Sequence, residues 1–230
     1  MTTRLAIVGM GKMGRAIDQL AAERGCEVVA RLDQPETGKG ITAAMLNGAQ
    51  VAVEFTTPGS AASNVRALID AGIPTVVGTT GWYDALAEIS KRVRDKHGAL
   101  LTAANFSLGV NAFEAILARA AAVLARTGGF DAQMIELHHS AKTDAPSGTA
   151  QTLEKSAAAE WGRAIPITSV RTGSIPGTHE VIFDAPFETI RLAHVARDRR
   201  VFAEGAIVAA KWLVGRHGVF TMKDVILSEG

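Results

Sequence analysis

The densest run of polar side chains in the chain lies at 136–150. His138, His139 and Lys142 stand within five positions there. These side chains can donate protons or hold anions, and a histidine titrates near neutral pH. Pro146-Ser147-Gly148-Thr149 then opens a predicted helix, whose first backbone N–H groups form an anion site beside the lysine. The pattern predicts proton transfer next to a bound carboxylate or phosphate.

Other interpretations of this run stay open. His138 or His139 at the end of a strand can be structural, and Ser147 or Thr149 can simply cap the helix. Two adjacent histidines also suggest a metal, but in a strand their side chains point to opposite faces. Since no further His or Cys stands at ligand spacing, we expect no metal site. No G-x-S-x-G nucleophile elbow is present either.

A glycine-rich loop near the N-terminus has the pattern of a nucleotide-binding loop. Gly9-Met10-Gly11-Lys12-Met13-Gly14 matches G-x-G-x-x-G between a predicted strand and a predicted helix. Asp33 stands 19 residues after Gly14, at the end of the next predicted strand. Glycines let backbone N–H groups approach a pyrophosphate, and the carboxylate accepts hydrogen bonds from ribose hydroxyls. The alternative is a glycine turn in some other α/β sheet.

Two further features near this loop have two interpretations each. Lys12 can pair with a cofactor phosphate, or it can be a solvated lysine. Gly78-Thr79-Thr80-Gly81 follows the fourth predicted strand, and ligands of parallel sheets bind beyond the carboxyl ends of the strands. This second loop can therefore contact the cofactor, or it can be a polar turn before a helix.

The elements that must position these residues alternate through the first hundred positions. Short apolar runs typical of buried strands are followed by segments with helical spacing. We predict strands at 5–8, 28–32, 51–55, 74–77 and 99–103, and helices at 15–24, 61–71 and 84–96. Strands that alternate with helices favour an α/β fold with a parallel sheet covered on both faces.

The pattern changes after Asn105. We predict helices at 110–125, 149–161 and 206–214, and strands at 134–139, 181–183, 188–195 and 201–202. Consecutive strands without helices between them suggest antiparallel pairing in an α+β second domain, and the helix at 206–214 is expected to return to the first domain. The glycine-rich segment 173–179, which ends in His179, could border the substrate pocket, but it is preferentially interpreted as a hairpin turn. The basic run 191–200 is interpreted as a solvated or subunit-interface strand.

Composition excludes several classes of protein. The chain has 230 residues, 47% apolar and 20% charged, which is typical of a globular protein. A formal net charge of +1 offers no electrostatic basis for binding nucleic acid or a membrane surface. Cys26 is the only cysteine, so no intrachain disulfide can form. The apolar run 5–10 is too short for a signal peptide, and Glu114 and Arg119 interrupt the best membrane-spanning candidate. We expect a cytoplasmic protein.

The polar run resembles a known family. Its His-His-x-x-Lys-x-Asp-Ala-Pro-Ser-Gly-Thr core is similar to the signature of 4-hydroxy-tetrahydrodipicolinate reductase, also called dihydrodipicolinate reductase, of bacterial lysine and diaminopimelate biosynthesis. The glycine loop, the segments 78–81 and 104–111, and the ending near 222–225 resemble the same family in the same order. The resemblance spans nearly the whole chain. The histidine-containing run is highly specific, whereas the glycine loop is not.

The resemblance implies a fold and a reaction. A Rossmann-type dinucleotide-binding domain would comprise 1–106, completed by 207–230. An inserted α+β domain at 107–206 would bind substrate and form a homotetramer. The reaction would be the reduction of a small cyclic dicarboxylate, the product of dihydrodipicolinate synthase, to tetrahydrodipicolinate by a hydride from NADH or NADPH. Hydride addition to a C=C–C=N system leaves electron density that needs a proton, which agrees with the acids in the polar run.

Site residues follow from the resemblance by position. His138 would be the acid/base residue and Lys142 the proton donor. The substrate carboxylates would be held by His139, Lys142, Ser147, Gly148 and Thr149. The cofactor would contact the glycine loop (Gly9, Met10, Gly11, Lys12, Met13 and Gly14) and Asp33, and its nicotinamide end would contact Gly78, Thr79, Thr80, Ala103, Ala104, Asn105 and Phe106.

The cofactor region departs from the family's usual pattern. The first glycine is shifted to Gly9, Lys12 stands where an arginine is usual, and Gln34 follows Asp33 where many members have an arginine. Asp33 would repel a 2′-phosphate and Gln34 brings no compensating charge, so NADH is the expected cofactor. Lys12 or Arg31 could still reach a phosphate and permit NADPH.

Two other functions stay open. One is another two-domain amino-acid dehydrogenase, such as an aspartate-dehydrogenase-like enzyme, against which the dicarboxylate site at 147–149 argues. The other is a non-catalytic nucleotide-binding sensor, against which the intact His138 and Lys142 argue.

Overall fold

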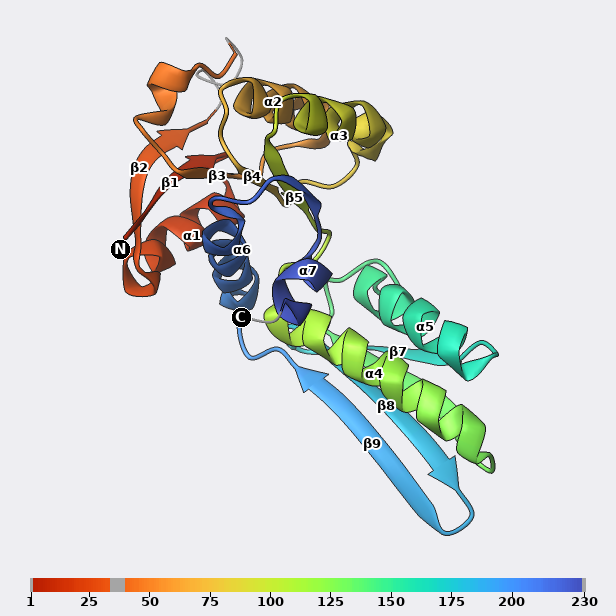
Figure 1. Ribbon diagram of the computed structural model, residues 1–230. Coiled ribbons are helices and arrows are strands. Elements are labelled where there is room, and N and C mark those ends of the chain that lie inside the picture. The colour runs from red at the N-terminus through yellow and green to blue at the C-terminus, as the bar shows by residue number, and fades with distance from the viewer. Residues whose placement is uncertain (1, 34–39, 229–230) are drawn as a thin grey trace. The chain divides into compact units, whose positions relative to one another are not determined.

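The computed structural model of the chain describes residues 2–33 and 40–228. It contains two compact units, one of Met1–Leu108 with Arg200–Gly230 and one of Gly109–Arg199 (Figure 1). Each unit has its own sheet and its own apolar core, so each is described by itself. Gln34, which bears on the expected cofactor, lies outside the described residues.

The first unit is built on a six-stranded sheet in which neighbouring strands are parallel. Its spatial order is β10 (Gly218–Phe220), β5 (Ala99–Thr102), β4 (Thr75–Val77), β3 (Val51–Glu54), β1 (Thr3–Val8) and β2 (Cys26–Leu32). The order reverses between β1 and β3, because β2 lies on one side of β1 and the later strands lie on the other. Ligands of such sheets bind beyond the carboxyl ends of the strands at this reversal.

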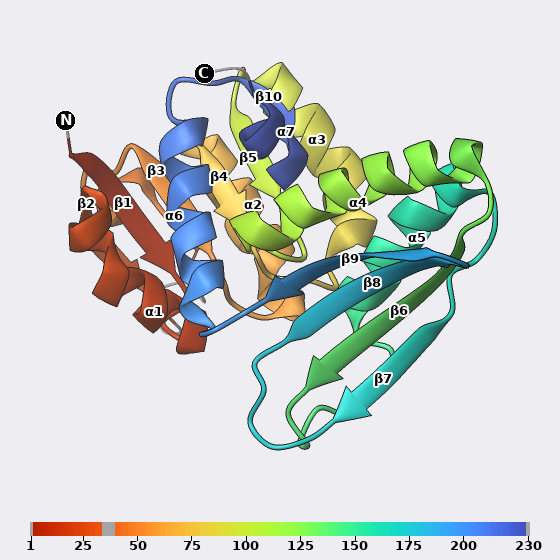
Figure 2. The same ribbon diagram turned by 90° about the horizontal axis from the view of Figure 1, so that it is seen from below.

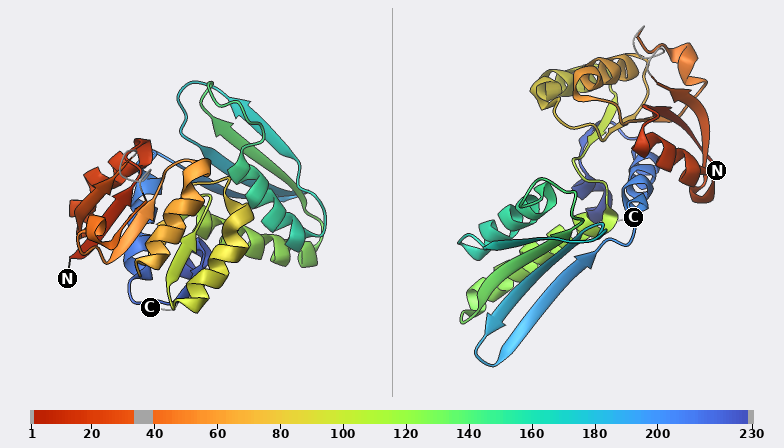
Figure 3. Two further views of the ribbon diagram at one scale, coloured as in Figure 1. Left: turned by 90° about the horizontal axis from the view of Figure 1, so that it is seen from above. Right: turned by 180° about the vertical axis from the view of Figure 1, so that it is seen from behind.

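Helices cover both faces of this sheet (Figures 1 and 3). α1 (Lys12–Ala21) and α6 (Arg200–Leu213) share one apolar core with the sheet, while α2 (Pro58–Asp70) and α3 (Leu86–Asp95) form the cores on the other face. The strands are apolar on both sides for this reason; all residues of 5–8 are fully buried. The remaining short helices are η1 (Ala22–Arg24), η3 (Ala43–Leu46), η4 (Tyr83–Ala85) and α7 (Met222–Leu227).

The second unit is a four-stranded mixed sheet with two helices on one face (Figure 2). Its order is β7 (Ile167–Arg171), β6 (Asp131–His138), β8 (Thr178–Ala185) and β9 (Glu188–Val195), and its helices are α4 (Leu108–Thr127) and α5 (Gly148–Trp161). Every second residue of β6 is buried, namely 132, 134, 136 and 138. This periodicity places Glu136 and His138 on the buried side of the sheet.

The predicted fold class is confirmed, and one predicted strand is wrong. Residues 201–202, predicted as a strand, lie in the first turn of α6, which begins at Arg200 rather than at 206. The predicted antiparallel pairing is confirmed for β8 with β9, while the sheet as a whole is mixed because β6 and β7 are parallel. The cause is α5, which lies between them in the chain and provides the crossover that parallel strands require.

Helix α4 is the one helix in the described part of the chain that is long and apolar enough to cross a membrane. It is a core helix here: Phe113, Leu117, Ala121 and Leu124 are buried in the apolar core of the second unit.

Candidate active site

The glycine loop between β1 and α1 fits the close approach of a pyrophosphate. Gly9 has φ +95°, and a Cβ there would lie 2.2 Å from the Phe55 carbonyl oxygen. A Cβ at Gly14 would lie 2.0 Å from the Gly9 carbonyl oxygen, so both glycines are required by packing. Gly11 differs: no atom of another segment lies within 4 Å of its Cβ position, and it caps α1 without a side chain. The first turn of α1 is therefore open to an anion.

The adenosine end of the predicted site includes one carboxylate and two cations. Asp33 follows β2 directly and is exposed, and Lys12 is the exposed first residue of α1. Arg31 donates two hydrogen bonds to Asp18 of α1, from Nε to Oδ2 at 2.9 Å and from Nη2 to Oδ1 at 2.6 Å. Two of the three Arg31 guanidinium nitrogens are therefore engaged by Asp18, whereas both interpretations of Lys12 stay open.

The loop at 78–80 after β4 is held by buried polar groups. The Thr79 hydroxyl accepts a hydrogen bond from the Thr56 backbone N–H at 2.8 Å, so it supports the loop itself. The Thr56 hydroxyl in turn donates a short hydrogen bond to Glu54, the fully buried last residue of β3. Burial raises the pKa of the Glu54 carboxyl, although the surrounding hydrogen bonds oppose this. A Cβ at Gly78 would overlap the Phe55 ring, 1.9 Å away, so the loop packs directly on that ring.

The segment 103–106 after β5 is fixed from two sides. Ala103 N–H donates to the Val77 carbonyl oxygen at 3.2 Å, and the Phe106 ring lies 5.6 Å from the Phe55 ring between centroids. A Cβ at Gly205 of α6 would lie 1.7 Å from the Phe106 carbonyl oxygen, so the helix backbone touches this segment. Sequence reasoning missed Gly205; the small residues at 203, 205 and 206 were the available signal. The ends of β1, β2, β4 and β5 thus carry the predicted cofactor residues at one edge of the parallel sheet.

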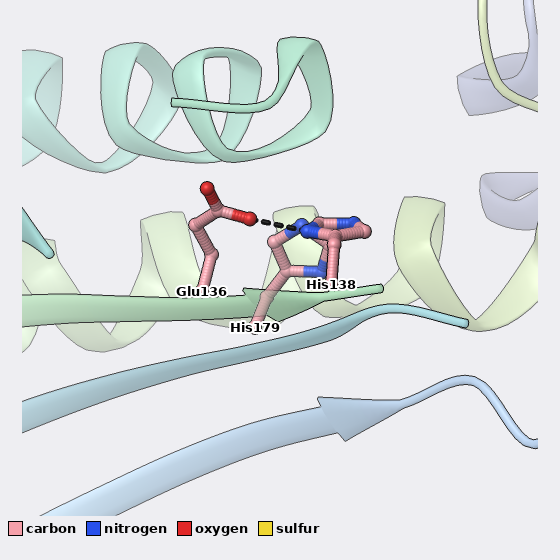
Figure 4. A group of neighbouring side chains, drawn as sticks. All are labelled: Glu136, His138 and His179. Atoms are coloured by element: carbon pink, nitrogen blue, oxygen red, sulfur yellow. Dashed lines mark hydrogen bonds and ion pairs between the residues drawn. The ribbon is translucent and has the colours of Figure 1, made fainter. Parts of the chain in front are cut away.

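In the second unit, Glu136, His138 and His179 form a buried cluster (Figure 4). The first two share the buried side of β6, and strand pairing sets His179 of β8 opposite Glu136. His138 Nδ1 makes a short hydrogen bond with Glu136 Oε2. The two histidine rings meet edge-on, with centroids 5.3 Å apart.

The second oxygen of Glu136 connects this cluster to β7 and α5. Arg171 Nη2 lies 2.6 Å from Glu136 Oε1 and donates also to the Asp144 carbonyl oxygen at 2.6 Å. The Ser147 backbone N–H donates to the same Oε1 at 3.4 Å. One buried carboxylate therefore joins β6, β7 and the segment that leads into α5.

The charges in the cluster are set by burial and by these hydrogen bonds. Burial raises the pKa of Glu136, but hydrogen bonds from Arg171, Ser169 and His138 outweigh it and hold the pKa at about 2. Burial lowers the pKa of His138, against the opposing effect of Glu136. Burial, with the neighbouring His138, lowers the pKa of His179 to about 4. At neutral pH the cluster therefore holds one carboxylate and neutral imidazoles.

Ser147 caps α5, as one of its interpretations predicts, and its contact with a substrate carboxylate stays a prediction. Its hydroxyl accepts from the Ala150 N–H at 3.2 Å and lies 3.3 Å from His179 Nε2. Gly148 and Thr149 form the first turn, and a Cβ at Gly148 would meet no atom of another segment within 4 Å. The cap residue of α5 is thus in direct contact with the acid–base cluster.

Lys142 and His139 lie on the turn that follows β6. The Lys142 backbone N–H donates to the His139 carbonyl oxygen at 3.1 Å. Lys142 Nζ lies 2.7 and 2.9 Å from the two carboxylate oxygens of Asp144. Lys142 is near enough that its charge lowers the pKa of His138. His138 is buried and His139 half-buried, as alternation in a strand predicts.

Three residues at this site, Glu136, His179 and the neighbouring Arg171, are absent from the predicted site residues. Glu136 was detectable, because a spacing of two in a strand shares a face with His138. Arg171 was not detectable, and His179 was considered only as the end of a glycine-rich segment that could border the substrate pocket. Each reaches the site by strand pairing: His138 pairs with Arg171, and Glu136 with His179. The hairpin interpretation of 173–179 is wrong, since β7 and β8 lie on opposite sides of β6 and His179 belongs to β8.

Glu136, His138 and His179 have ligand atoms within 4.8 Å of one another, close enough to surround a metal ion. Their existing partners oppose this use. One Glu136 oxygen is taken by His138 and the other by the Arg171 guanidinium, a fixed positive charge 2.6 Å away. The absence of a metal site stays a prediction; we expect chelators to leave any activity unchanged.

Together the two units define an α/β protein of the Rossmann class, with a second, mixed-sheet unit that carries a buried acid–base cluster. Residues 3–106 match the N-terminus and residues 109–226 the C-terminus of dihydrodipicolinate reductase. The chain belongs to the dihydrodipicolinate reductase family.

Curated relatives support this membership. A 4-hydroxy-tetrahydrodipicolinate reductase from Thiobacillus denitrificans is 36% identical over 271 residues, which cover 98% of this chain and 99% of the relative. One from Christiangramia forsetii is 33% identical over 234 residues, which cover 96% of this chain and 97% of the relative. The family resemblance inferred from the polar run is therefore confirmed.

Solved structures confirm the fold. A dipicolinate-bound dihydrodipicolinate reductase from Paenisporosarcina sp. TG-14 has a TM-score of 0.84 at 21% identity and covers 99% of this chain and 100% of its own. Aspartate dehydrogenase from Thermotoga maritima has a TM-score of 0.52 at 8% identity, with 93% and 97% covered. The fold is thus much nearer to the reductase than to that dehydrogenase.

Proposed function

We propose that the chain reduces 4-hydroxy-tetrahydrodipicolinate to tetrahydrodipicolinate with NADH or NADPH, in lysine and diaminopimelate biosynthesis. Membership of the reductase family supports the reaction class. The observation that carries the assignment to this site is that an acid–base residue and a cation are joined to the start of α5. Buried His138 bonds Glu136, which accepts from the backbone N–H of the cap residue Ser147. Lys142 pairs with Asp144, three residues before that cap. A cyclic dicarboxylate that must be protonated needs both an acid–base residue and an anion site.

The first unit is proposed to hold the dinucleotide. Its contacts would be the glycine loop 9–14, Asp33, and the loops at 78–80 and 103–106. When bound, the nicotinamide supplies a hydride. The open position at Gly11 and the uncapped start of α1 support binding of the pyrophosphate here. The buried Glu54 network would keep the loop at 78–80 in one conformation.

The second unit is proposed to hold the substrate and to protonate it. His139, Lys142, Ser147, Gly148 and Thr149 would bind the carboxylates through charge and through donors at the start of α5. The hydroxy substrate loses water to give the C=C–C=N system, and hydride addition to one end leaves an electron pair at the other. A proton from His138 or Lys142 at that atom completes the reduction, so one hydride and one proton are consumed per turnover.

NADH is the proposed preferred cofactor, with NADPH as the weaker alternative. Asp33 can accept hydrogen bonds from both adenosine ribose hydroxyls, and its charge would repel a 2′-phosphate. The pairing of Arg31 with Asp18 supports this preference, because it engages one of the two cations that could offset the repulsion.

The same proposal includes the cellular compartment and the oligomeric state of the protein. The chain is proposed to act in the cytoplasm as a homotetramer, with subunit contacts made by the second unit. An amino-acid dehydrogenase is disfavoured by the lower structural similarity to aspartate dehydrogenase, and a non-catalytic sensor by the ordered cluster around His138.

An assay coupled to dihydrodipicolinate synthase tests this function. Purified chain is mixed with synthase, pyruvate and aspartate semialdehyde, and NADH absorbance is followed. We expect oxidation that depends on both enzymes, with tetrahydrodipicolinate as product. Absence of synthase-dependent oxidation with both NADH and NADPH would contradict the proposal. NADH oxidation that needs only a 2-oxo acid and ammonium, without the synthase, would favour the dehydrogenase alternative.

A further inference from the structure

We propose that Glu136 is a positioning residue for His138: its carboxylate holds the imidazole in the Nδ1–H tautomer, so that Nε2 is the ring atom presented for proton transfer. The inference rests on the proposed reductase function and adds to it a residue that touches neither substrate nor cofactor.

The hydrogen-bonding chemistry of the pair dictates the tautomer. Glu136 is fully buried, and its Oε2 bonds His138 Nδ1 (Figure 4). An ionised carboxylate can only accept, and a neutral imidazole has one N–H donor and one acceptor nitrogen. Nδ1 must therefore carry the proton, which leaves Nε2 with the lone pair that takes up and returns a proton.

Arg171 holds the carboxylate in its place. Its Nη2 bridges Glu136 Oε1 and the Asp144 carbonyl oxygen, at 2.6 Å from each, and its side chain is 17% exposed. A guanidinium stays charged at all relevant pH values, so it keeps Glu136 ionised and oriented. The Ser147 N–H at 3.4 Å adds a second donor to Oε1. The carboxylate is thus fixed from β7 and from the start of α5.

Gly177 leaves room beside the presented nitrogen. It has φ +155°, and a Cβ there would lie 3.1 Å from His138 Nε2 and 3.4 Å from Cδ2. The distance to Nε2 is tighter than ordinary van der Waals contact, and the distance to Cδ2 is at its lower limit. A glycine on the segment before β8 therefore keeps a side chain away from Nε2, while Glu136 fixes the other side of the ring.

Four charged or titratable groups face His138. Glu136 lies on its own strand, Arg171 on β7, His179 on β8 and Lys142 on the following turn. Only the Glu136 charge favours the imidazolium; the two cations disfavour it, and His179 is a neutral neighbour at neutral pH. Removal of the Glu136 charge should therefore make His138 harder to protonate.

The test compares Glu136→Gln with Glu180→Gln. Glu180 lies on β8 in an ion pair with Arg191 at 2.7 Å, so its variant loses a carboxylate from the same sheet without touching the cluster. For Glu136→Gln we expect kcat to fall about tenfold or more with KM changed less than about threefold. The high-pH limb of kcat should move to lower pH by about one unit. Glu180→Gln should match the parent.

The proposal would be overturned if Glu136→Gln had the same kcat and the same pH profile as the parent. It would also be overturned if the variant raised KM and left kcat unchanged. Ring 1H–15N spectra of the unaltered protein, with His138 assigned by its absence in His138→Gln, give a readout independent of folding of the variant. They should show the Nδ1–H tautomer; the Nε2–H tautomer would overturn the proposal. Failure of the proposed function appears separately, as an inactive parent, and leaves the tautomer test intact.

Discussion

Arg31 and Asp18 form a bidentate ion pair at the surface of the first unit, with donor–acceptor distances of 2.9 and 2.6 Å. Arg31 stands two positions before Asp33, so the two side chains leave the chain on the same side of β2 and its continuation. Asp18 therefore engages, from α1, the cation nearest in sequence to the carboxylate proposed to bind the adenosine ribose. In the proposed function, this ion pair therefore bears on the choice between NADH and NADPH.

We predict that Asp18→Ala raises kcat/KM for NADPH by about fivefold, roughly 1 kcal/mol, because Arg31 becomes available to a 2′-phosphate. The NADH value should stay within about twofold of the parent. Steady-state kinetics at low salt give both numbers. Asp70→Ala is the matched control, since Asp70 forms a bidentate pair with Arg92 between α2 and α3.

An unchanged NADPH value in Asp18→Ala would show that Arg31 does not reach the phosphate. A parent that favours NADPH tenfold or more, about 1.4 kcal/mol, would contradict the NADH preference itself. Gln34→Arg should also improve NADPH selectively, because it adds a cation directly after Asp33.

His138→Gln and Lys142→Ala should each lower kcat about 10²-fold or more, the usual range for loss of a positioned proton donor. Dissociation constants for the cofactor, measured by fluorescence titration, should barely change, since both residues belong to the second unit. Lys155→Ala, an exposed lysine on α5, should behave as the parent. If both variants kept near-parental kcat, the acid assignment would be wrong.

Pyridine-2,6-dicarboxylate should inhibit competitively with the substrate, because it is planar, carries both carboxylates and resists hydride addition. Thr149→Val should weaken this inhibition by about 1–3 kcal/mol, the cost of an unpaired carboxylate acceptor. Thr152→Val is the control: its hydroxyl bonds the Gly148 carbonyl oxygen at 3.0 Å, one turn into the helix. Equal inhibition constants for Thr149→Val and the parent would show that the carboxylate does not bind at Thr149.

Stability should fall as the pH drops from 6.5 toward about 4, because His179 is neutral in the fold and protonates with its ordinary pKa when unfolded. The unfolded chain binds more protons in this window, so acid favours unfolding. The stability that Glu136 contributes through its lowered pKa is lost only at lower pH, between 4.5 and about 2. Urea midpoints at neutral pH and at about pH 5 check this. His179→Asn should flatten the dependence; the parental slope in that variant would place its origin in other groups.

Gly205→Ala should destabilise the first unit by about 2 kcal/mol or more, because its Cβ would lie 1.7 Å from the Phe106 carbonyl oxygen and must push α6 away. Gly59→Ala is the opposite case. Gly59 lies in α2 with nothing within 4 Å of its Cβ position, so alanine there should stabilise by about 0.5–1 kcal/mol. Thermal unfolding of the two variants should shift in opposite directions; a shift in the same direction would contradict the packing assigned to Gly205.

The parallel sheet was predictable because its signal is local. Each strand is a short apolar run followed by a helix, and burial on both faces of a parallel sheet demands that pattern. The start of α6 was not predictable in this way, because Val201 is β-branched and Phe202 is aromatic, and both residue types favour strands by propensity. Their helical state comes from the helix that continues through Leu213 and packs on the sheet.

The candidate site was predictable where its residues are neighbours in sequence. His138, Lys142 and Ser147 belong to one run of the chain, so their types and spacing indicated acids beside a helix start. Arg171 and His179 are brought to the cluster by pairing of β7 and β8 with β6. Such pairing depends on contacts between distant segments, and the glycine-rich segment before β8 resembles a hairpin turn when read locally.

Isotope transfer tests the central claim most directly. NADH carrying deuterium at C4 is prepared separately in each of its two stereochemical forms and is oxidised in the synthase-coupled reaction. The mass of the tetrahydrodipicolinate formed is then measured by mass spectrometry. The account predicts product heavier by one mass unit from one of the two forms, together with unlabelled product from the other. Unlabelled product from both forms would contradict it, because the hydride would then not come from the nicotinamide.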